Sequence, residues 1–254
     1  MSRAQNWLPW GGDISRERCE APMKLIQIIA PRRNICAACE VTAAYGPFVT
    51  EAILATVIET LREEHRNIAR LLEALDHQVD VFAQAGSPDY DVVSGIAEYF
   101  LEYPDLCHHP KEDVVFRRLR ETHPQDASKI GDLLGEHRVV HERAGRFRDA
   151  VGALLNDTDI ARSVVVDAAR QFIEAERRHM QKEEEQFLPL AERVLTPVDW
   201  SLIEGALSIG RDPLFGARVE EKFARLRERL LAWEQEYRAA PDLSAGVTPE
   251  SAAS

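Results

Sequence analysis

Histidine and glutamate residues recur at four-residue spacing along this chain, a pattern that suits metal binding. Three pairs share the spacing: His108/Glu112, His137/His141 and His179/Glu183. Residues four apart on a helix differ by about 40° around its axis, so both side chains of a pair can reach one centre. Imidazole and carboxylate ligands together suit Fe, Mn, Zn or Cu. The spacing therefore predicts a metal site built from several helices.

The surrounding apolar residues predict that these side chains point into a core. His65 fills the gap in an apolar stripe that steps by threes and fours. The three pairs continue the apolar stripes of the later segments in the same way. An isolated polar group that faces an apolar core costs roughly 2 kcal/mol or more unless it finds a partner. Seven such residues need a common explanation, and a two-metal centre between facing helices supplies one.

The elements that must position these residues are long amphipathic helices. The stripes predict an all-α fold, an up-down-up-down four-helix bundle over residues 51–195. Antiparallel neighbours then bring the ligands to one level. His65 lies 19 residues before Gln84, for example, and His108 lies 19 residues after Asp89 on the next helix.

Breaks between the helices follow from turn residues. The expected helices run over about residues 51–84, 89–121, 126–155 and from 159 onward. Pro104 and Pro110 predict a kink or break within the second helix.

Three further segments flank the bundle. Residues 1–50 lack sustained periodicity and are expected to form an irregular, poorly ordered extension. Cys36 and Cys39 in this extension are only a weak signal of a metal or redox role, since no second pair accompanies them, and the sequence leaves their role open. Residues 196–240 form a C-terminal extension, in which an amphipathic helix is expected from Pro213 to Arg238. Its stripe must be buried on the bundle or on another subunit, and the sequence leaves both open. Residues 241–254 are expected to form a flexible tail.

Composition excludes several classes of function. The chain has 254 residues, 45% hydrophobic and 29% charged, with a net charge of −12. This charge repels phosphate backbones and argues against nucleic-acid binding. No apolar run approaches the ~20 residues of a membrane span. Four cysteines in a chain of this length fit a reducing compartment, so we expect a cytoplasmic protein that does not bind membranes.

The ordered set of motifs resembles the hemerythrin-like, or HHE cation-binding, family. The matching motifs are His65, His108-His109-Pro110-Lys111-Glu112, His137-x-x-x-His141 and His179-Met180-Gln181-Lys182-Glu183-Glu184-Glu185. The resemblance covers about residues 51–195 and implies a non-haem di-iron centre with an oxo or hydroxo bridge. Transferred by position, it implies that one iron is held by His137, His141 and His179. The other iron would be held by His65 and His108, with Glu112 and Glu183 bridging.

Several neighbouring side chains are less clearly assigned. Glu184 has the offset of the last carboxylate in oxygen-carrying hemerythrins, but Glu183 shares a face with the preceding histidine. Glu184 and Glu185 are therefore expected on a solvated face. His109 lies about 100° from His108 and is expected beside the site or exposed. Glu176 falls on the inward stripe, where either a supporting role or a misjudged helix face explains it.

The ligand count predicts the class of function. Three imidazoles, two carboxylate oxygens and the bridge complete one octahedral iron, whereas the iron with two imidazoles keeps an open position. We expect O₂, or else NO or peroxide, to bind there for oxygen binding, storage or sensing. The alternatives are a di-iron enzyme that decomposes peroxide or handles NO, and an iron donor in iron–sulfur cluster repair. A homo-oligomer or a signalling partner would contact residues 213–238.

Overall fold

The computed structural model describes residues 47–156, 158–207 and 212–239. Within these ranges the chain is all-helical, with no strand, as the stripes predict. The expected extension over residues 1–50 lies outside the described part, except that its last four residues already belong to the first helix. Cys36, Cys39 and the tail 241–254 also lie outside it. No helix in the described ranges is long and apolar enough to cross a membrane.

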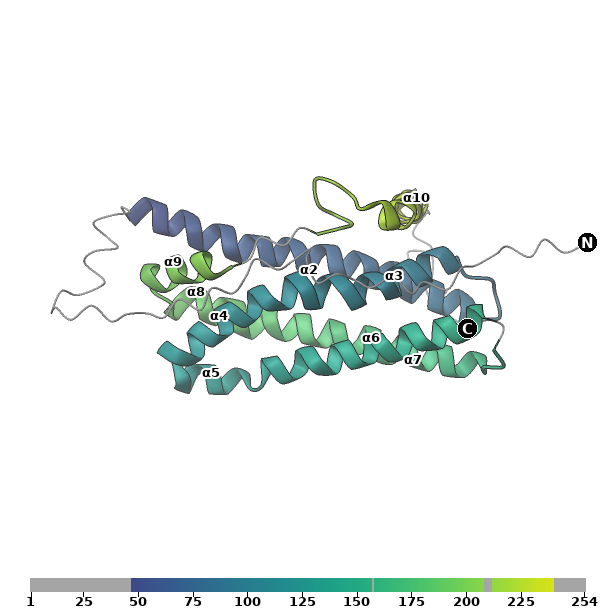
Figure 1. Ribbon diagram of the computed structural model, residues 1–254, viewed down its shortest axis with the longest axis horizontal. Helices are drawn as coiled ribbons and strands as arrows, with labels where there is room; N and C mark the ends of the chain where they lie inside the picture. Colours follow the sequence, from purple (N-terminus) through teal and green to yellow (C-terminus); the bar gives the residue numbers. More distant parts are fainter. Residues whose placement is uncertain (1–46, 157, 208–211, 240–254) are drawn as a thin grey trace, which may run out of the picture.

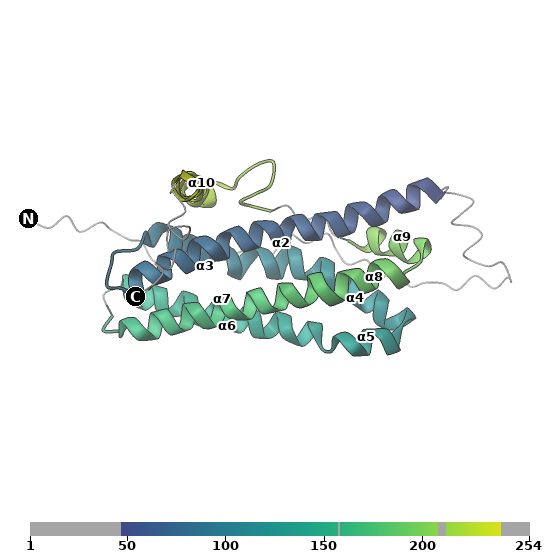
Figure 2. The same cartoon turned by 180° about the vertical axis from the view of Figure 1, so that it is seen from behind.

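The long helical segments lie side by side along the longest axis of the molecule (Figures 1 and 2). They are α2 (Pro47–Ala83), α3 (Tyr90–Tyr103) continued by α4 (His109–Thr122), α6 (Leu133–Leu155), and α7 (Arg162–Lys182) continued by α8 (Leu188–Val194). Helix α7 packs against α2 and α6, and α3 packs against α6 and α2. Each segment therefore contacts two neighbours and presents one face to a shared interior.

That interior contains two hydrophobic clusters. On α2, Leu61 belongs to one cluster and Ile68 to the other, with His65 between them. The same change of cluster occurs along α6, from Leu133 through His137 to Val140. A layer of buried polar side chains thus divides the apolar core across its long axis.

A π-helical turn replaces the expected break in the second helix. Residues Pro104–His108 form this turn, in which the backbone N–H of His109 donates to the carbonyl of Pro104. Pro110 follows two residues later and cannot donate to the carbonyl four residues before it, so the helix widens there. A second π-helical turn, Glu183–Phe187, precedes Pro189 at the same offset and was not expected.

The third expected helix is divided in two, which corrects the prediction of one helix over about 126–155. Helix α5 (Pro124–Ile130) ends at Gly131, whose φ of 89° lies in the left-handed region that favours glycine. Helix α6 then begins after Asp132, whose carboxylate accepts the backbone N–H of Gly135.

The C-terminal helix is shorter than expected. Residues 213–220 form turns, and the helix begins only with a 3₁₀ turn at Glu221–Phe223 and α10 (Ala224–Ala239), which corrects the expected start at Pro213. Its buried residues Phe223, Leu226 and Leu230 belong to the cluster that α3 and α2 share. The stripe is therefore buried on this chain's own helices. A short helix α9 (Pro197–Ala206) packs against α2 and α4.

Helix α10 packs closely against α3 at Gly95, and a larger side chain at this position tests that contact. A Cβ atom at Gly95 would lie 3.2 Å from the Leu226 Cβ atom. We expect Gly95→Leu to weaken the α10 contact by about 1–3 kcal/mol through overpacking, seen as faster hydrogen exchange of α10 amides. Gly145→Leu is the control, because nothing lies within 4 Å of its Cβ position. Equal exchange of α10 in both variants would contradict this docking.

Candidate metal centre

Two fully buried glutamates lie at the centre of the polar layer. Glu112 is on α4 and Glu183 opens the second π-helical turn, and both are 0% exposed. His65 on α2 reaches both of them, with its Nε2 atom 3.1 Å from a Glu112 oxygen and 3.4 Å from a Glu183 oxygen. The Nε2 atom of His108 lies 3.4 Å from the same Glu112 oxygen. These two imidazoles form one side of the site.

Histidines from α6 and α7 form the other side. The Nε2 atom of His137 lies 3.5 Å from a Glu112 oxygen and 3.4 Å from a Glu183 oxygen. The Nε2 atom of His179 lies 3.2 Å from that Glu183 oxygen. Both carboxylates therefore contact imidazoles on both sides, which is the arrangement expected of groups that bridge two ions.

His109 completes the second side. It is 5% exposed, and its ring stacks on that of His137 with centroids 4.2 Å apart and an interplanar angle of 9°. Potential ligand atoms of four side chains lie within 4.8 Å of one another: His109, Glu112, His137 and His179. A second group with the same property consists of His65, His108 and Glu112. Because Glu112 belongs to both groups, the two cation positions are adjacent.

An outer set of carboxylates orients the imidazoles. The Nδ1 atom of His65 lies 2.6 Å from Glu184, and that of His108 lies 2.9 Å from Glu64. In the same way, the Nδ1 atom of His109 lies 3.0 Å from an Asp105 oxygen, and that of His137 lies 3.1 Å from an Asp113 oxygen. A carboxylate can only accept, so each Nδ1–H donates outward and each Nε2 atom faces the centre. This carboxylate–histidine pairing is typical of metal-binding imidazoles.

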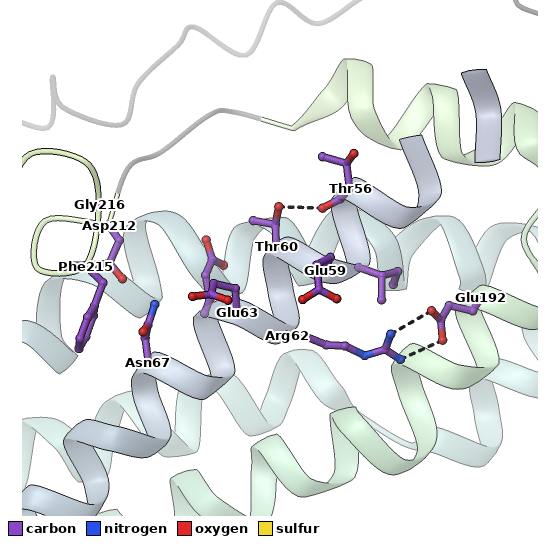
Figure 3. A pocket seen from close by; sticks show the side chains of 12 residues that line it. Thr56, Glu59, Thr60, Arg62, Glu63, Asn67, Glu192, Asp212, Phe215 and Gly216 are labelled. Atoms are coloured by element: carbon purple, nitrogen blue, oxygen red, sulfur yellow. Dashed lines mark hydrogen bonds and ion pairs between the residues drawn. The ribbon is translucent and has the colours of Figure 1, made fainter. Parts of the chain in front are cut away.

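Basic side chains pair with two of these outer carboxylates. Lys111 contacts Glu64, and Arg62 lies 3.6 Å from Glu184. Arg62 also pairs with Glu192 at the rim of a pocket of about 810 Å³ beside α2 (Figure 3). None of the imidazoles and neither central carboxylate of the layer lines this pocket, so it lies outside the metal site, although Glu64 lines it and also pairs with His108.

The residues fit a pair of metal ions. Several buried atoms of the layer have no hydrogen-bond partner in the described residues: Glu112 Oε2, Glu183 Oε2, His109 Nε2, and both ring nitrogens of His179. Buried polar atoms are otherwise almost always paired, because desolvating them is costly. Metal ions between the imidazole and carboxylate groups would satisfy these atoms, and this donor set suits transition metals.

The electrostatics of the layer also favour cations. Burial would raise the pKa of Glu112, but the imidazoles of His108 and His137 outweigh it and hold that pKa well below its usual value. Burial lowers the pKa of His179, which leaves its ring neutral. Burial would also lower the pKa of His137, but Asp113 and the two central carboxylates raise it to about 12. Without metal, imidazolium charge therefore compensates the buried carboxylates.

The structure brings six of the seven predicted ligands into this layer: His65, His108, Glu112, His137, His179 and Glu183. His141 does not join them, which corrects its expected place. Its side chain is 51% exposed and pairs with Asp105. The inward positions of α6 step from His137 by three to Val140, so His141 falls outside the stripe.

His109 takes the place expected of His141. Regular α-helical geometry turns it about 100° from His108, but the π-helical turn directly before it lets both rings face inward. Pro110 predicted an irregularity in this helix, but the sequence analysis did not foresee that the irregularity would turn His109 inward. Glu184 is also not simply solvated, because it is bound to His65. Glu176 is 0% exposed, so its inward face was judged correctly.

Comparisons with known proteins agree with this geometry. The hemerythrin HHE cation-binding domain family matches residues 56–191. No match was found among curated proteins or among solved structures.

Replacing His109 and His141 in turn tests whether the metal is held by the histidine that the structure places inward or by the one that regular helical spacing predicts. We expect His109→Gln to lose about one metal ion per chain after loading with ferrous iron, because it removes an inward Nε2 ligand. His141→Gln should keep the wild-type content. Elemental analysis of both variants decides the matter, and equal losses would show that the π-helical turn does not place His109 at the site.

Metal binding should release protons. The raised pKa values of His65 and His137 keep both rings protonated at neutral pH without metal, whereas coordination needs a free Nε2 lone pair. We expect roughly two protons released per chain at pH 7, and tighter binding as pH rises. Calorimetry in buffers of different ionisation enthalpy measures this release. His137→Gln should release about one proton fewer, whereas replacing exposed His77 should change nothing.

Proposed function

The chain belongs to the hemerythrin HHE cation-binding domain family, and from this we propose that its histidine–glutamate layer holds two iron ions that bind a small ligand reversibly. We propose that the helices form the up-down-up-down four-helix bundle that the sequence predicts. The observation that best supports the di-iron site is that Glu112 belongs to both groups of potential ligands. A bridging carboxylate has a role only where two ions are adjacent.

The proposed ligand sets follow the two groups, with Glu183 added because its oxygens lie 3.2–3.4 Å from imidazoles of both. One iron is held by His109, His137 and His179, and the other by His65 and His108. Glu112 and Glu183, which contact imidazoles of both sets, would bridge the two ions. His109 thus replaces His141 without changing the expected three-to-two division of imidazoles. The iron with two imidazoles keeps an open position, as reactive metal sites do and structural ones do not.

The composition of the site favours binding over oxidation chemistry. Five imidazoles and two carboxylates surround the pair, whereas ferritin-like di-iron proteins use four glutamates and two histidines. Fewer anionic ligands stabilise high-valent iron less, so we propose O₂ binding, storage or sensing, with NO or peroxide as related ligands. Hydrophobic clusters lie on either side of the layer, whose imidazole and carboxylate side chains are at most 7% exposed.

Anaerobic loading with ferrous iron tests this function directly. We expect about two irons per chain, and visible bands that appear with O₂ and disappear under argon over repeated cycles. One metal ion per chain would contradict the di-iron site. Irreversible oxidation, or continuous turnover of added peroxide, would instead support an enzyme. Protein loaded with zinc is the control, because zinc has no redox chemistry.

A further inference from the structure

Glu176 is a buried carboxyl group to which the proposed ligand sets give no role. It is 0% exposed, and neither oxygen has a hydrogen-bond partner among the described residues. Glu183 has oxygens 3.2–3.4 Å from three imidazoles, whereas Glu176 forms no ion pair with any described residue. Burying an unpaired carboxyl opposes folding, so a role outside the folding of the chain has to account for it.

Its position on α7 directs it toward the metal layer. The inward residues Phe172, Glu176, His179 and Glu183 step by four, three and four, so they share one face. Phe172 belongs to the hydrophobic cluster beside the layer, and His179 to the layer itself. Glu176 therefore lies at the boundary between the apolar cluster and the metal site.

The charges that act on Glu176 are those of the site. Burial has the largest effect on the pKa of Glu176, and the charges that act on it next are the imidazoles of His109 and His108 and then the carboxylates of Glu183 and Glu112. His109 and His108 belong to different groups of potential ligands, so the charges that act on Glu176 come from both proposed ion positions. Burial raises its pKa, which favours the protonated form that can donate a hydrogen bond.

We propose that Glu176 is a ligand-positioning residue, whose carboxyl group hydrogen-bonds the small molecule that binds at the open metal position. This inference rests on the proposed function and narrows the class of ligand. The ligand has an outer atom that accepts a hydrogen bond, as a peroxide or a small anion such as azide does. The apolar cluster around Phe172 limits its size.

Azide binding to the iron-loaded, full-length protein provides the test. Glu176→Leu removes the polar group, and Glu176→Gln keeps a hydrogen-bond donor of the same shape. We expect azide affinity, titrated by visible absorption, to fall roughly tenfold or more in the Leu variant, as loss of one hydrogen bond to a charged group predicts. The Gln variant should stay within about threefold of the wild type. Iron content should be unchanged in both.

A second measurement does not depend on the metal. Without metal, Glu176→Leu should raise the midpoint of thermal unfolding, because it replaces a buried, unpaired carboxyl by an apolar group. Glu174→Leu is the matched control on the same helix, since Glu174 is 71% exposed and pairs only with Arg178. We expect this control to leave azide affinity unchanged.

The outcomes separate the two proposals. Unchanged azide affinity in Glu176→Leu would overturn the positioning role and leave the proposed function intact. Loss of iron from Glu176→Gln would show that Glu176 is itself a metal ligand, and a lower unfolding midpoint in Glu176→Leu would show that it has a partner in the folded chain. Either result overturns the inference. If the iron-loaded wild type does not bind azide, the proposed function fails, and the role of Glu176 with it.

Discussion

Two carboxylates at the centre of an apolar core, Glu112 and Glu183, impose the constraint on which the rest of the structure depends. Neither has any exposed surface. A buried charge of this kind costs several kcal/mol in effective terms unless opposite charge lies close by. The surrounding imidazoles supply that charge when no metal is bound, and metal ions would supply it when they are. The core is consequently divided into two hydrophobic clusters, because the polar layer must extend across all the long helices.

The imidazoles in turn depend on a further set of charges. Each of His65, His108, His109 and His137 donates its Nδ1–H to a carboxylate farther from the centre. Lys111 and Arg62 then neutralise part of this outer negative charge. Such a network fixes both the tautomer and the orientation of a ring before a metal arrives, and lowers the reorganisation needed for binding. A net charge of −12 over the whole chain also favours the approach of cations.

The π-helical turns relate backbone geometry to this chemistry. One ends at His108, directly before His109, and the other begins at Glu183. π-helical turns are rare, and many of those known lie at functional sites. Both turns precede a proline by two residues, and the proline prevents the regular backbone hydrogen bond there. A local feature of the sequence thus changes which side chains a helix presents to the interior.

The sequence by itself determined the all-helical fold and six of the seven side chains at the centre of the polar layer, because helical periodicity is local and each apolar stripe fixes an inward face. Tertiary structure decided the seventh: His141 points outward because the inward positions of α6 step from His137 to Val140, and His109 points inward beside the π-helical turn that begins at Pro104. Tertiary structure also decided that the apolar stripe of α10 is buried on this chain's own helices, through the approach of Leu226 to Gly95. A stripe specifies that a face must be covered, but only the packed chain specifies what covers it, because contacts between distant residues leave no local periodic signal.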